Sequence, residues 1–176
     1  MKTLPIPHPG QLLLLAAPRA FLSQAMPLLI ARLSLPNGIW VLDFGNSFNY
    51  HVVARTLRRH TIDLPTHLER IRIARAFTCY QVLSLLAQTP TSIHPTIGLE
   101  FLSTFHDENV SGAERWRLFD QSLEHLRRLS QLAPVAVSAA IPPTGGTDAW
   151  FTALEEHASQ VWRLENHQQA FQPRFF

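Results

Sequence analysis

The sequence predicts an α/β fold of three layers, in which a mainly parallel sheet of five or six strands lies between two layers of helices. Short runs of consecutive apolar residues alternate with longer segments of helical periodicity. This is the pattern of parallel strands that are buried on both faces and joined by helices. The 176 residues are 46% hydrophobic and 16% charged, which is typical of a compact globular domain. No internal repeat divides the chain, so we expect a single domain.

The first half of the chain supplies three of the expected strands. Residues 11–16 form an apolar run of strand length, and the periodic segment 21–33 predicts the first helix. The Pro-Asn-Gly turn at 36–38 separates this helix from the apolar run 39–42, which predicts the second strand. The remaining elements of this half are a helix at 50–59, a strand at 71–73 and a helix at 80–86.

The second half begins after Pro90 and Pro95, where the run 97–102 predicts a fourth strand. Segment 114–132 is the longest helical pattern, because its large apolar residues recur at three- and four-residue steps. The remaining elements are a strand at 135–137, a helix at 148–158 and a strand at 160–164. We therefore expect an N-terminal extension at 1–10, one α/β domain at 11–165 and a C-terminal tail at 166–176.

Cysteine and lysine usage restrict the environment and the chemistry of the chain. No apolar run approaches the ~20 residues of a membrane-spanning helix, so no membrane partner is expected. The single cysteine, Cys79, forms no internal disulfide and lies in an apolar helical segment. We expect it to be a core residue in a reduced, cytoplasmic protein. Lys2 is the only lysine in the sequence.

Three stretches together resemble the ATPase core of RecA-type recombinases, especially their archaeal and eukaryotic branch. Residues 41–48, Val-Leu-Asp-Phe-Gly-Asn-Ser-Phe, resemble the family's I-D-T-E-G-T-F strand end. Residues 71–77, Ile-Arg-Ile-Ala-Arg-Ala-Phe, resemble its "ARAF" segment. Residues 99–138 resemble its metal-site strand, first DNA loop, long helix and following strand. The resemblance implies a RecA-like P-loop NTPase fold.

The same resemblance locates the phosphate-binding loop, whose glycines let the backbone wrap the phosphates and whose lysine and hydroxyl bind the phosphate oxygens and Mg²⁺. The G-x-x-x-x-G-K-[ST] pattern falls on residues 16–23. Ala16 and Phe21 replace the two glycines, Leu22 replaces the lysine, and only Ser23 keeps its type. We expect Phe21 and Leu22 to fill the space of the phosphates.

The other nucleotide-site positions that the resemblance implies have also changed. The general-base glutamate falls on Gly45, the metal-site aspartate on Glu100 and the nucleotide-sensing glutamine on Ala140. Asp43 remains, and a strand-end aspartate is also typical of a residue that caps the following turn. We expect no ATP hydrolysis, no catalytic residues and no cofactor.

Metal and nucleic-acid sites have weaker sequence support. The histidines lack the i, i+4 spacing of a helical zinc pair, so we expect no metal site. Arg115 and Arg117 lie where the family's first DNA loop leads into its helix, and we take them as DNA-binding candidates. Arg55, Arg58 and Arg59 form a second basic group, which a helix C-terminus also explains. The segment matching the second DNA loop, 141–147, carries no positive charge, so any DNA binding should be weak.

The tail contains three phenylalanines, Phe171, Phe175 and Phe176. Either the chain's own domain or a protein partner is expected to cover them. The resemblance then implies an ATPase-inactive RecA paralogue that acts as a binding or assembly protein in DNA recombination or repair. Its expected partner is a catalytic RecA-type relative or another repair protein. The alternatives are a stand-alone single-stranded nucleic-acid binding module and a nucleotide-binding enzyme with an unrecognised site.

Overall fold

The computed structural model describes residues 4–142 and 148–164. These residues form one sheet of six parallel strands in the order β3-β2-β4-β5-β1-β6. The strands are β1 (Leu12–Ala17), β2 (Ile39–Asp43), β3 (Ile71–Arg75), β4 (Thr96–Leu99), β5 (Val135–Ala140) and β6 (Gln160–Arg163). The helices are α1 (Arg19–Ser34), α2 (Tyr50–Leu57), α3 (Leu64–Glu69), α4 (Cys79–Gln88), the 3₁₀ helix η1 (Ser103–His106), α5 (Gly112–Ser130) and α6 (Ala149–His157). The predicted three-layer α/β class is confirmed.

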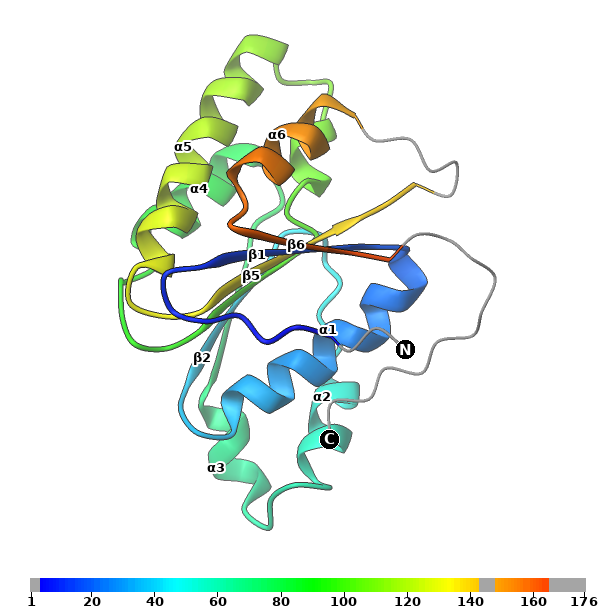
Figure 1. Ribbon diagram of the computed structural model, residues 1–176, viewed down its shortest axis with the longest axis vertical. Helices are drawn as coiled ribbons and strands as arrows, with labels where there is room; N and C mark the ends of the chain where they lie inside the picture. The colour runs from blue at the N-terminus through cyan, green and yellow to red at the C-terminus, as the bar shows by residue number, and fades with distance from the viewer. Residues whose placement is uncertain (1–3, 143–147, 165–176) are drawn as a thin grey trace.

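The direction in which the chain crosses the sheet explains the two helical layers. From β1 to β2 and β3 the chain moves toward one edge, and the connecting helices α1, α2 and α3 lie on one face (Figure 1). From β3 to β4, β5 and β6 it moves the opposite way, and α4, α5 and α6 lie on the other face (Figure 1). Parallel strands are joined by right-handed crossovers, so reversing the direction transfers the helices to the other face.

Strand β1 shows how the sequence supplies both cores. Leu12, Leu14 and Ala16 belong to the core under α4, α5 and α6. The intervening residues, Leu13, Leu15 and Ala17, belong to the core under α1 and α2. Every residue of β1 is buried, as a central parallel strand requires. The expected N-terminal extension contributes as well, because Leu4 is only 4% exposed and joins the second core.

The structure departs from the sequence-based elements in three places. Helices α3 and η1 are additional, and each is too short to give a clear apolar period. The expected strand at 97–102 ends at Leu99, because Glu100 takes a φ of 53° and turns the chain away from the sheet. The two edge strands are not buried on both faces, and Ile73 of β3 and Val161 of β6 are exposed.

The chain's single cysteine lies in the core, as predicted. Cys79 is 1% exposed at the first position of α4, and burial raises the pKa of its thiol. A raised pKa disfavours the thiolate, which is the nucleophilic form. No helix among residues 4–142 and 148–164 has the length and apolar character needed to cross a bilayer.

Candidate functional site

The topology of the sheet determines where a ligand site is expected. Strands β1 and β5 are neighbours, but the helices that follow them, α1 and α6, lie on opposite faces of the sheet (Figure 1). The same is true of β2 and β4, which are followed by α2 and α5 (Figure 1). In open parallel sheets, ligands bind at such switch points, beyond the carboxyl ends of the strands. The predicted nucleotide-site residues all follow or end these four strands.

The connection from β1 to α1 is too short to form a phosphate-binding loop. Strand β1 ends at Ala17 and α1 begins at Arg19, so Pro18 alone joins them. The amides of Phe21 and Leu22 both donate to the Pro18 carbonyl, at 2.9 and 3.1 Å. These two helix-end N–H groups are therefore already bonded within the chain. Proline also lacks an N–H, which removes another donor that a phosphate would need.

Leu22 and Phe21 contact different parts of the fold at the start of α1. Leu22 lines the hollow between α1 and the loop after β2. Phe21 instead stacks on Trp162 of β6, with ring centroids 5.5 Å apart, and packs into the core. Both side chains are buried, and the expectation that they fill the space of the phosphates stays a prediction.

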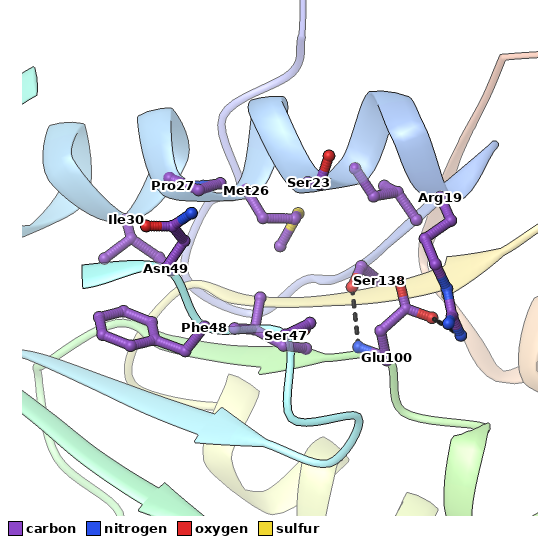
Figure 2. A pocket seen from close by; sticks show the side chains of 12 residues that line it. Arg19, Ser23, Met26, Pro27, Ile30, Ser47, Phe48, Asn49, Glu100 and Ser138 are labelled. Atoms are coloured by element: carbon purple, nitrogen blue, oxygen red, sulfur yellow. Dashed lines mark hydrogen bonds and ion pairs between the residues drawn. The ribbon is translucent and has the colours of Figure 1, made fainter. Parts of the chain in front are cut away.

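Glu100 lies at the centre of the site, on the segment that follows β4. Its backbone N–H donates to Ser138 Oγ at 2.9 Å, and its carboxylate lies 3.7 Å from the Arg19 guanidinium (Figure 2). The residue is 6% exposed, and burial raises the pKa of its carboxyl group, while Arg19 and the Ala140 N–H act against this rise. Arg19 and Glu100 thus form an ion pair where the resemblance places phosphates and Mg²⁺.

Gly45 explains why the general-base position carries no side chain. A Cβ at residue 45 would lie 2.4 Å from the Cβ of Glu100 and 2.9 Å from its Cγ. Such distances are far inside van der Waals contact, so the segments that follow β2 and β4 can lie this close only with glycine at residue 45. A glutamate cannot enter this position without moving the Glu100 backbone.

Asp43 serves the structure of the turn after β2. The carboxylate is fully buried and accepts hydrogen bonds from the N–H groups of Ser47 and Phe48, at 2.9 and 3.1 Å. The guanidinium of Arg75, at the end of β3, pairs with it at 3.3 Å. All these contacts lie within the fold, so Asp43 caps the turn and joins β2 to β3.

The space left at the site is small. A hollow of about 30 Å³ lies between α1 and the 47–49 loop. Its apolar lining includes Leu22, together with Met26 and Phe48, which are labelled in Figure 2. This volume holds only a water molecule or two, whereas sites for nucleotide-sized ligands need roughly 300–1,000 Å³. Ser23 also lines it, but its hydroxyl donates to the Ala20 carbonyl.

A second hollow, of about 120 Å³, lies on the other side of Arg19 and Glu100. Its polar wall includes His106 and Asp148, whose side chains are joined by a 2.5 Å contact. Asp148 also caps α6 by accepting from the Phe151 N–H. Ala140 lines this hollow with a methyl group, so it offers no side-chain donor to a nucleotide.

The arginines predicted to contact DNA have mixed positions. Arg115 donates to the Phe105 carbonyl at 3.0 Å and lies over the Trp150 ring, so it holds η1 and α6 against α5. Arg117 forms two bonds to Glu114, at 2.7 and 2.8 Å, and one to Gln121. Both are occupied by contacts within the chain. Arg55, Arg58 and Arg59 are exposed on α2 and just after it.

Three further expectations concern a metal site, the tail and the second loop. Among the described residues, no three His, Cys, Asp or Glu side chains form a group that would hold a metal ion. The tail residues Phe171, Phe175 and Phe176 lie outside the described residues, as does 143–147 of the second loop. No protein-family model and no curated protein matches this chain.

Sequence reasoning missed three side chains of the site. Arg19 lies within the 16–23 pattern but at a position where the pattern allows any residue. Ser138 lies on β5 and ends the 99–138 stretch that resembles the family, but that pattern does not indicate its contact with Glu100. His106 bonds to Asp148, 42 residues later. The absence of every lysine but Lys2 was the one signal that pointed to a cation of another type at the helix start.

Proposed function

We propose that this chain is a RecA-type paralogue that neither binds nor hydrolyses ATP, and that it acts as an assembly protein in DNA recombination or repair. The observation that carries the proposal is the Arg19–Glu100 ion pair at the carboxyl edge of the sheet. It occupies the place where the family resemblance puts the nucleotide phosphates. Arg19 supplies the positive charge that the family's lysine would supply, and the Glu100 carboxylate supplies the negative charge that the phosphates would supply.

Gly45 and Pro18 support the same proposal independently. Gly45 stands at the general-base position and leaves no room for a glutamate beside Glu100. Pro18 is the whole connection between β1 and α1. The fold is thus kept while each part of the nucleotide chemistry is replaced by an internal contact. A domain of this kind would act through contacts made by its surface.

The surface offers an open sheet edge for a protein contact. Strand β3 lies at one end of the sheet, so the main-chain groups on its outer side have no neighbouring strand in the described fold. Ile73 on this strand is 42% exposed, and Phe77 just after it is 66% exposed. Large apolar side chains beside an unpaired strand are typical of a surface that adds a partner chain. We propose that a catalytic RecA-type relative binds here.

The proposal is tested by capturing the protein's partners from its native host and comparing variants by quantitative mass spectrometry. We expect the wild-type chain to enrich recombination or repair proteins. Phe77→Asp should lose them, because it places a charge in the contact. Leu132→Asp is the matched control, since Leu132 is 58% exposed at the end of α5, away from β3.

Two results would contradict this function. If the wild-type chain captures no recombination or repair protein, the proposed assembly role is wrong. If Phe77→Asp and Leu132→Asp both capture the same partners as the wild type, the β3 edge is not the contact.

A further inference from the structure

A third hollow lies at the opposite edge of the sheet, where the strands begin. It has a volume of about 380 Å³ and is bounded by the 36–38 turn, the start of β2, the end of α3 and the segment before β4. Its polar side chains include Trp40, Glu69, Arg70, Arg72 and His94. None of these residues belongs to the carboxyl-edge site, but Arg72 lies on β3, the edge strand proposed for the partner contact. The phosphate titration described below needs no partner, so its result does not depend on that contact.

Positive charge dominates this hollow. Arg70 and Arg72 both line it, and Glu69 is the single acid among its lining residues. Neither guanidinium has an ion pair within the described part of the chain. Arg72 instead lies over the Trp40 ring, 5.1 Å from its centroid. Two exposed guanidinium groups beside one hollow provide bidentate donors suited to an anion's oxygens.

Two ring nitrogens in the wall are unsatisfied. Trp40 Nε1 and His94 Nδ1 are buried, and within residues 4–142 and 148–164 neither has a hydrogen-bond partner. The indole N–H is a donor only, so it needs an acceptor. A buried polar group without a partner is uncommon in proteins and is costly. The wall around the hollow thus holds three side chains that only donate: Trp40, Arg70 and Arg72.

The absence of a side chain at Gly38 helps to keep the hollow open. Gly38 forms part of its floor, and a Cβ there would lie 3.3 Å from the Arg70 carbonyl oxygen and 3.6 Å from His94 Nδ1. A larger residue at 38 would fill the space beside His94. Arg58 and Arg59 follow α2 on the connection that leads to this same edge, and both are exposed.

We propose that this hollow binds a phosphate group held by Arg70 and Arg72. Once Arg72 moves off the Trp40 ring, a phosphate oxygen accepts a hydrogen bond from the Trp40 indole N–H. A phosphate has several acceptor oxygens and more than one negative charge, so it matches a set of donors with little acid among them. A phosphodiester of nucleic acid and a free phosphate ligand share this chemistry. The exposed Arg58 and Arg59, on the connection from α2 to α3, would extend the contact along a nucleic-acid backbone.

The test follows the Trp40 indole N–H by heteronuclear NMR, with its resonance assigned from Trp40→Phe. The full chain is titrated at low salt with inorganic phosphate and, separately, with a short oligothymidylate. We expect a saturable shift of the Trp40 resonance. Arg70→Gln and Arg72→Gln should each weaken binding about tenfold, as expected for loss of a charge-assisted hydrogen bond. Arg127→Gln removes the same charge from an exposed position on α5 and should bind as wild type.

The two titrations distinguish the sources of the phosphate. Tighter binding of the oligonucleotide identifies a nucleic-acid backbone, and equal binding per phosphate identifies a free phosphate ligand; either result supports the site. The proposal is overturned if neither titrant moves the Trp40 resonance. It is also overturned if folded Arg70→Gln and Arg72→Gln proteins bind as wild type, or if Arg127→Gln weakens binding equally.

Discussion

Substitution of Gly45 by alanine tests the close approach of the two segments that follow β2 and β4. The new Cβ would lie 2.4 Å from the Glu100 Cβ, so one of the two segments must move. Extra atoms forced into a well-packed region cost about 1–3 kcal/mol. For a domain of this size, each 1 kcal/mol lowers the melting temperature by about 2–4 °C. We therefore expect Gly45→Ala to melt about 2–12 °C below the wild type.

Gly112→Ala is the control for this substitution, because a Cβ at Gly112 meets nothing within 4 Å. Gly112 is the first residue of α5, where alanine also has the better helix propensity. Gly112→Ala should melt at or slightly above the wild-type temperature. Thermal unfolding of both variants by circular dichroism makes the comparison.

A second background shows whether the Glu100 side chain is the cause. Glu100→Gly removes the clashing Cβ and Cγ and relieves the positive φ of 53°. In that background Gly45→Ala should cost almost nothing, so the coupling between the two positions should equal most of the single-variant cost. The reasoning is refuted if Gly45→Ala is tolerated like Gly112→Ala, or if its cost is the same with and without the Glu100 side chain.

Three further predictions concern Glu100, Arg128 and the tail. Burial raises the folded-state pKa of Glu100 above 4.5, so the folded chain binds this proton more tightly than the unfolded one. The free energy of unfolding of wild type, measured by chemical denaturation relative to Glu100→Gln, should be greatest below pH 4.5 and fall as the pH rises through the folded-state pKa. A difference between the two proteins that does not change with pH would contradict this. Arg128 donates hydrogen bonds to the Leu86 and Thr89 carbonyls at the end of α4. Arg128→Ala should therefore lower the free energy of unfolding by about 1–3 kcal/mol in denaturant titrations, whereas Arg127→Ala, at an exposed neighbouring position, should lower it little. Equal losses for the two variants would refute this role of Arg128. Truncation after Asn166 should leave the melting temperature unchanged and reduce partner capture if the tail phenylalanines serve a partner, whereas a lower melting temperature with full capture would assign them to the chain's own domain.

The sequence predicts most of the fold, because its signals are local. The all-apolar run of β1 and the Trp116–Leu129 stripe of α5 each indicate one kind of element within one window. Helix α3 was missed, since it has only six residues, begins next to a proline and buries none of them fully. The exposed edges β3 and β6 follow from strand order, which no local pattern reveals.

The candidate site depends on contacts between distant residues, and these were harder to predict. The resemblance places the family's general-base glutamate at Gly45. The need for glycine there arises from Glu100, which is its neighbour only because β2 pairs with β4. The family pattern makes Arg115 a DNA-binding candidate, and this stays a prediction. The structure shows that it bonds to the Phe105 carbonyl and covers Trp150, contacts that the one-dimensional pattern does not carry.

The central claim is that the nucleotide site has been replaced by internal contacts, and ATP binding tests it most directly. A ligand present at 100 times its Kd stabilises the folded chain by ~2.7 kcal/mol, which corresponds to about 5–11 °C in melting temperature for a domain of this size. Thermal unfolding should be measured with and without ATP and Mg²⁺ at millimolar levels. The account predicts the same melting temperature in both conditions, and a saturable upward shift of several degrees would contradict it.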